Sequence, residues 1–156
     1  MKQFFINNYK IIIICATILV VAILGSTFVN LGMDWYDSLI KPTQWIPNFV
    51  IPLVWTVLYL LFAIILSVLS KQNLLTTKDN YLSIANAVFN ILWCLIFFTL
   101  NQLLIGNIII IINAFIGTLL LVSLSKIDKK YISLLWLYVI WLLIATSLNV
   151  ALWILN

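Results

Sequence analysis

The sequence of 156 residues contains no histidine, no glutamate and no arginine, and only 8% of its residues are charged. Soluble domains usually have about 25% charged residues, so this composition excludes the ordinary soluble class. Without histidine there can be no histidine-based catalytic triad and no H-E-x-x-H zinc site. Without glutamate or arginine, glutamate general acids and arginine phosphate clamps are also excluded. We therefore expect no metal site and none of the familiar acid–base enzyme mechanisms.

Apolar residues make up 65% of the chain, and its mean hydropathy is +1.23. Five stretches carry no charge: 11–29, 50–70, 81–100, 103–125 and 132–154. At about 1.5 Å per residue, each is long enough to cross a hydrocarbon core of roughly 30 Å as a helix. The apolar runs are continuous and do not alternate, which favours helices over a barrel. The sequence predicts an all-α membrane protein, a bundle of five transmembrane helices forming one domain over residues 1–156.

The stretch 11–29 could be read as the core of a signal peptide, but it exceeds the roughly 7 to 15 residues of such cores and is better read as a span. Alternating spans place most lysines on one side of the membrane, namely Lys2, Lys10, Lys71, Lys78, Lys126, Lys129 and Lys130. Only Lys41 falls on the other side. The positive-inside rule then predicts a cytoplasmic N-terminus and an external C-terminus. Scattered lysines form no basic stripe, so we expect no nucleic-acid binding. The use of lysine without arginine, together with many isoleucine and asparagine residues, suggests an AT-rich genome. Such a genome in turn suggests a bacterial cytoplasmic membrane.

The first connection, residues 30–49, is too long to serve only as a link between two spans. It combines aromatic anchors, rigid prolines and an i,i+4 pair of Asp37 with Lys41 on a short helix. Its candidate lid residues are Trp35, Lys41, Pro42, Trp45 and Pro47. Two interpretations stay open: the segment is a lid over a site, or it only seats its tryptophans at the membrane interface.

Three of the spans carry aromatic and amide side chains at helical spacing, and these residue types are costly enough in lipid to mark interior faces. The candidate ligand-binding residues are Trp55, Tyr59, Asn86, Asn90, Trp93, Phe97, Tyr138, Trp141, Ala145 and Asn149. Most lie in the half of the membrane nearer the long loop, which predicts a cavity that opens toward that loop. The alternative is that the aromatic residues only pack the helices and the amides only join them, at about 0.6 kcal/mol per hydrogen bond.

Small and polar residues mark two other faces, Ala22 with Ser26 in the first span and Gly106, Asn113 and Gly117 in the fourth. Such faces let helix backbones approach closely. We expect them to serve packing or dimer contacts and to have no role in ligand binding. Cys15 and Cys94 lie within spans and are expected to behave as small packing residues.

A series of short motifs and single residues follows in a fixed order along the chain: Trp35-Tyr36, Lys41-Pro42, Val54-Trp55, Leu58-Tyr59, Asn90, Trp93, Phe97-Phe98, Tyr138, Trp141, Ala145, Leu148-Asn149, Trp153 and Asn156. In these motifs, and in having five spans, the sequence resembles the TspO/MBR family, which includes the tryptophan-rich sensory proteins of bacteria and the mitochondrial translocator protein. The resemblance covers nearly the whole chain from Trp35 onward.

The resemblance implies a five-helix bundle, usually a homodimer, with a ligand pocket under the first loop. It implies tetrapyrrole ligands such as protoporphyrin IX, drug-like isoquinolines and benzodiazepines, and no required cofactor. The residues that would line the pocket are Trp55, Tyr59, Asn90, Trp93, Trp141 and Ala145. The family's cholesterol-recognition segment is not matched, because Val150 and Ile154 stand where a tyrosine and a basic residue are needed, so we expect no cholesterol binding.

The leading functional hypothesis is a membrane binding, transport or sensory protein for porphyrins and related hydrophobic molecules. An alternative implied by the resemblance is light-dependent porphyrin breakdown, with Trp55 and Trp141 as candidate electron donors. A third hypothesis is a structural membrane scaffold whose aromatic residues only pack.

Overall fold

In the computed structural model, residues 2–43, 46–47 and 49–156 are described, and this part of the chain forms helices joined by short connections. The elements are α1 (Lys2–Leu31), α2 (Met33–Ser38), α3 (Val50–Lys71), α4 (Thr77–Cys94), η1 (Leu95–Thr99), α5 (Leu103–Leu124), α6 (Lys129–Ile132), η2 (Ser133–Leu135) and α7 (Trp136–Leu155). Five helical segments are long and apolar enough to cross a membrane. The predicted class, an all-α membrane protein with five spans, is confirmed.

The helix ends follow local sequence signals. Thr76 begins α4 with a capping box, in which its hydroxyl accepts from the Asp79 backbone N–H while the Asp79 carboxylate accepts from the Thr76 backbone N–H. Asn73 and Asn101 adopt positive φ values of 54° and 57° in the connections that precede α4 and α5. Asparagine tolerates this left-handed conformation better than most residues, which permits both tight turns.

One element was not predicted. The last turn of the third span is a π-helix, η1, in which the Leu100 N–H donates to the Leu95 carbonyl five residues earlier, at 2.9 Å. The Thr99 hydroxyl also donates to the Phe28 carbonyl of α1 at 2.9 Å. The π-helical turn therefore ends the third span in contact with α1.

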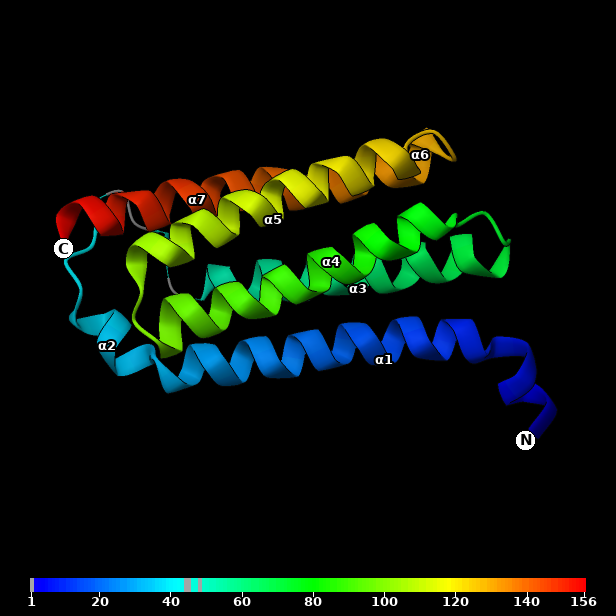
Figure 1. Ribbon diagram of the computed structural model, residues 1–156, viewed down its shortest axis with the longest axis horizontal. Helices are drawn as coiled ribbons and strands as arrows, with labels where there is room; N and C mark the ends of the chain where they lie inside the picture. The colour runs from blue at the N-terminus through cyan, green and yellow to red at the C-terminus, as the bar shows by residue number, and fades with distance from the viewer. Residues whose placement is uncertain (1, 44–45, 48) are drawn as a thin grey trace.

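The long helices run side by side in an elongated bundle (Figure 1). The principal helix contacts are α4 with α5, α5 with α7, and α1 with both α3 and α4. The N-terminus and the α3–α4 connection lie at one end, whereas α2 and the C-terminus lie at the other (Figure 1). In α1 only 11% of the most apolar window is buried, against 44% in α5. Helix α1 is thus an outer wall of the bundle, and α5 belongs to its core.

The loop 30–49 contains α2, and the predicted pair forms: Lys41 Nζ lies 2.8 Å from Asp37 Oδ1, although α2 itself ends at Ser38. The Asn156 side chain holds the loop against α7, because its Oδ1 accepts from the Ile40 N–H and its Nδ2 donates to the Ile40 carbonyl. The half-buried Trp35 packs edge-on against Phe97 at 6.0 Å between ring centroids. Pro42 is half-buried and Pro47 exposed, and Trp45 lies outside the described residues.

Candidate functional site

A cavity of about 640 Å³ lies beneath the first loop, and we call it the loop-side cavity. Its walls come from α1, α2, the first turns of α3 and the end of the third span. The residues that line it are Ala22, Ile23, Gly25, Ser26, Val29, Asn30, Met33, Tyr36, Asp37, Ile51, Pro52, Trp55, Thr56, Tyr59, Trp93, Cys94 and Phe98. The cavity therefore lies at the end of the bundle where the aromatic stripes predicted it.

Trp55 is the point at which three helices meet. Its ring stacks on Tyr59 one turn further along α3, with centroids 5.6 Å apart. Across the bundle it contacts Trp93 of α4 at 6.0 Å and Tyr138 of α7 at 6.3 Å. Side chains from the three aromatic stripes are therefore brought together around one indole.

Few polar groups accompany these rings. The Tyr59 hydroxyl donates to Asn90 Oδ1 at 3.2 Å. The indole N–H of Trp93 is buried and has no hydrogen-bond partner within the described part of the chain. A buried donor without an acceptor is uncommon in native proteins, because leaving it unpaired is costly. Trp93 is thus a wall residue of the cavity whose own donor group is buried and unpartnered.

Four predicted residues are buried but are not among the residues that line the described cavities: Phe97, Trp141, Ala145 and Asn149. Phe97 packs against Phe98 and Trp93, and an added Cβ at Gly106 would lie 2.8 Å from its ring. The backbone carbonyl of Asn149 accepts from Asn107 Nδ2 at 3.4 Å. All four side chains belong to the buried interior, and the Trp141 indole N–H and Asn149 Nδ2 have no hydrogen-bond partner within the described residues.

The small-residue face of α5 packs closely as expected, since an added Cβ would lie 2.8 Å from Phe97 at Gly106 and 2.9 Å from Tyr138 at Gly117, whereas the face of α1 was not expected to line a cavity. Ala22 and Ser26 of α1, expected only to pack, line the loop-side cavity together with Gly25. Asn113 of α5 does more than allow close approach, because its amide bonds to both Asn86 and Tyr138. Helix α1 could not be recognised as a cavity wall from its sequence, since its aliphatic residues look the same whether they face lipid or a cavity.

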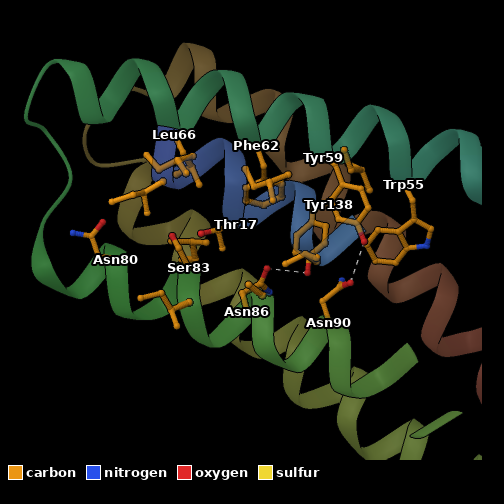
Figure 2. A pocket seen from close by; sticks show the side chains of 18 residues that line it. Thr17, Trp55, Tyr59, Phe62, Leu66, Asn80, Ser83, Asn86, Asn90 and Tyr138 are labelled. Carbon is orange, nitrogen blue, oxygen red and sulfur yellow. Dashed lines mark hydrogen bonds between the residues drawn. The ribbon is translucent and has the colours of Figure 1, made fainter. Parts of the chain in front are cut away.

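Asn86, Asn90 and Tyr138 face a second cavity, of about 270 Å³, between α1, α3 and α4, which we call the inner cavity (Figure 2). It lies further from the loop, and Trp55 and Tyr59 line both cavities. The bond from Tyr59 to Asn90, drawn as a dashed line in Figure 2, spans the boundary between them.

The charged groups of the site lie at its loop end. The Lys41 ammonium sits 4.5 Å from the centre of the Tyr36 ring while it pairs with Asp37. Burial raises the pKa of the Tyr36 phenol, and the neighbouring Asp37 carboxylate raises it further, so the phenol stays protonated at neutral pH. Within the described residues no three histidine, cysteine or acidic side chains gather as a metal site would require. The site is built for binding by ring contacts and single hydrogen bonds.

The sequence was also compared with those of known proteins. Protein CrtK of Rhodobacter capsulatus is 33% identical over 132 residues, which is 78% of each chain. The tryptophan-rich protein TspO of Archaeoglobus fulgidus is 28% identical over 152 residues, covering 96% of this chain and 99% of its own. The TspO protein of Chlorobaculum tepidum is 28% identical over 138 residues, with 84% and 85% covered. The model of the TspO/MBR family matches residues 13–154, and the chain belongs to that family of membrane proteins.

Proposed function

We propose that this protein binds protoporphyrin IX and related flat, hydrophobic molecules in the loop-side cavity, and that it serves as a sensor or carrier of them in the membrane. The observation that carries the proposal is the aromatic wall of Trp55, Tyr59 and Trp93 on a cavity of about 640 Å³. Small-molecule pockets in proteins usually measure about 300 to 1,000 Å³ and combine apolar walls with few polar groups. Isoquinoline- and benzodiazepine-like molecules have the same flat, aromatic character.

The polar groups of the cavity suit the edges of a macrocycle. A shift of the Trp93 ring that exposes its buried N–H to the cavity would let that group donate to a carbonyl or carboxylate oxygen. At the rim, Lys41 is held by Asp37 in an exposed ion pair. Exposed pairs of this kind contribute little stability, so a ligand carboxylate can replace Asp37 at small cost.

The experiment is titration of the detergent-solubilised protein with protoporphyrin IX while tryptophan fluorescence is followed. We expect saturable quenching at micromolar or lower concentration. Trp55→Phe should weaken binding by about two- to tenfold, since an aromatic contact contributes about 0.5 to 1.5 kcal/mol beyond the area it buries. Trp153→Phe is the matched control, because Trp153 is 46% exposed and lines neither cavity.

Absence of quenching in the folded wild-type protein would overturn the proposal. Equal affinities of the two variants would instead place the porphyrin elsewhere. The light-dependent alternative is checked on the same sample, because it requires the porphyrin absorption spectrum to change under illumination in air. A scaffold role predicts that Trp55→Phe changes thermal stability and no ligand response.

We further infer that the protein lies in a bacterial cytoplasmic membrane with its N-terminus inside, because the lysine-bearing N-terminus and the α3–α4 connection share one end of the bundle (Figure 1). The loop-side cavity would then open toward the outer face. The homodimer implied by the family stays a prediction, and it would place two copies of the site in one assembly.

A further inference from the structure

The inner cavity differs in chemistry from the loop-side cavity. About half of its lining is aliphatic, formed by Ile13, Ile14, Ile18, Val21, Leu58, Leu66, Ile84, Ala87 and Leu120, and the rest is aromatic or carries single polar groups, as at Phe62, Tyr138, Thr17 and Ser83. At the end nearer the first loop, Trp55 and Tyr59 separate it from the loop-side cavity. The Tyr59 hydroxyl donates a hydrogen bond to Asn90 there. At about 270 Å³ it is less than half as large as the loop-side cavity. A slot of this size and lining suits a hydrocarbon chain better than a macrocycle.

The opposite end of this slot is polar. A third cavity of about 440 Å³ lies there, and Ile13, Ile14 and Asn80 line both it and the inner cavity. The other residues around it are Tyr9, Lys10, Ser70, Asn73 and Leu75. We call this region the mouth. The apolar slot and the polar mouth therefore adjoin along one face of α1.

Lys10 supplies the charge at the mouth. Its ammonium donates to the neutral Asn73 Oδ1 at 3.1 Å, and within the described residues it forms no ion pair. Lys10 lies at the end of the first span, where the hydrocarbon core meets the headgroup region. A lysine there can hold its ammonium among lipid headgroups while its stem covers apolar surface. The mouth thus presents an uncompensated positive charge with amide groups around it.

We propose that the inner cavity and the mouth form a second ligand site, for an amphiphile with one hydrocarbon chain and an anionic headgroup. The chain lies between α1, α3 and α4, and the anion binds Lys10 with help from the amides of Asn73 and Asn80. Along α1 the distance from Lys10 to Val21 is about 16 Å at 1.5 Å per residue. Carboxylates and phosphate monoesters share the required charge, and either can be the headgroup.

The selectivity of this second site depends on the environment that the ligand leaves, which is the lipid bilayer and not water. A chain that leaves the bilayer for an apolar slot gains little from the hydrophobic effect, since lipid tails are as apolar as leucine. The preference must therefore come from the headgroup, and chiefly from the charge on Lys10. The site should discriminate anionic from neutral amphiphiles of equal chain length, and the discrimination should weaken at high salt.

The test is native mass spectrometry of the full chain in neutral detergent with dodecanoate, dodecyl phosphate or dodecanol. We expect both anions to bind about fivefold better than the alcohol, the upper range for an exposed ion pair. Lys10→Gln should abolish this preference. Lys71→Gln is the matched control, because Lys71 is an exposed lysine of α3 that lines none of the described cavities. Ala87→Phe should block the slot and reduce binding of every probe.

Each result of this experiment either supports or overturns the proposed second site. Preference for the phosphate alone would support the site and identify a phosphate headgroup as its target, and preference for dodecanoate alone would identify a carboxylate. Equal binding of all three probes, or equal loss in the two lysine variants, would overturn the proposal. Lys10 does not line the loop-side cavity, so Lys10→Gln should leave quenching by protoporphyrin unchanged. The two proposals can therefore fail independently, and unchanged helicity and melting temperature show that the variants fold.

Discussion

Three side chains from three helices close a ring of hydrogen bonds inside the bundle. Asn86 Nδ2 donates to Asn113 Oδ1 at 2.8 Å, Asn113 Nδ2 donates to the Tyr138 hydroxyl at 3.3 Å, and that hydroxyl donates to Asn86 Oδ1 at 3.0 Å. All three residues are buried. Each group thus satisfies another in the buried interior, which fixes α4, α5 and α7 in one register beside Trp55.

Removing the hydroxyl in Tyr138→Phe should destabilise the fold, because it leaves Asn86 Oδ1 and Asn113 Nδ2 without that partner. We expect about 1 kcal/mol, between the average and the largest values known for hydrogen bonds between membrane helices. Thermal unfolding in detergent measures this as a lower melting temperature. Tyr81→Phe, at a tyrosine that is 71% exposed, should leave it unchanged. The loss in Tyr138→Phe with Asn86→Leu should be smaller than the sum of the single losses, and strict additivity would contradict a shared network.

At the scale of elements, the junction between α1 and α2 determines how closely the first loop packs on the end of the third span. A Cβ placed on Gly32 would lie 2.1 Å from the Phe98 carbonyl oxygen, at the π-helical end of the third span. The obstacle is backbone, which cannot move aside as a flexible side chain can. The absence of a side chain at Gly32 therefore lets α2, with Tyr36, pack against Phe98 at 5.2 Å.

Gly32→Ala should separate α2 from η1 and open the loop-side cavity. We expect a lower melting temperature and weaker quenching by protoporphyrin, because Tyr36 and Phe98 both line that cavity. Gly25→Ala in α1 is the control for the melting temperature alone, since the nearest atom to its added Cβ is Cys94 Sγ at 3.5 Å, an ordinary contact, whereas Gly25 itself lines the cavity. Similar stability of the two variants would show that the junction can relax.

The helices were predictable because charge and hydropathy alone define them. All five membrane-spanning segments begin and end within about four residues of the predicted spans. Convergence at Trp55 was also predictable, since aromatic and amide groups are costly in lipid. The π-turn at Leu95–Thr99 was not, as no local signal distinguishes it from an α-turn. Nor could spacing alone separate Trp55, which lines a cavity, from Trp141, which is buried and lines none of the described cavities, because a small rotation of a helix exchanges these positions.

At the scale of the whole molecule, two cavities follow each other along α1 and share Trp55 and Tyr59. Helix α1 is the least buried span, so both cavities have one wall on the outside of the bundle. Aromatic and aliphatic side chains line both parts of this path. The bundle is polarised along its axis in charge, because most lysines belong to the end that bears the N-terminus.

That polarity predicts the orientation of the chain. The lysines at the N-terminal end resist translocation, whereas Lys41 stands alone at the loop end and is paired with Asp37. Alkaline phosphatase, which is active only outside the cytoplasm, should be active when fused after Asn156 and inactive when fused within the α3–α4 connection. Replacing Lys71 and Lys78 together by glutamine should shift part of the population toward the inverted orientation, because the bias falls while the spans stay intact. An inactive fusion after Asn156 in the wild-type chain would reverse the assignment and place the loop-side cavity on the cytoplasmic face.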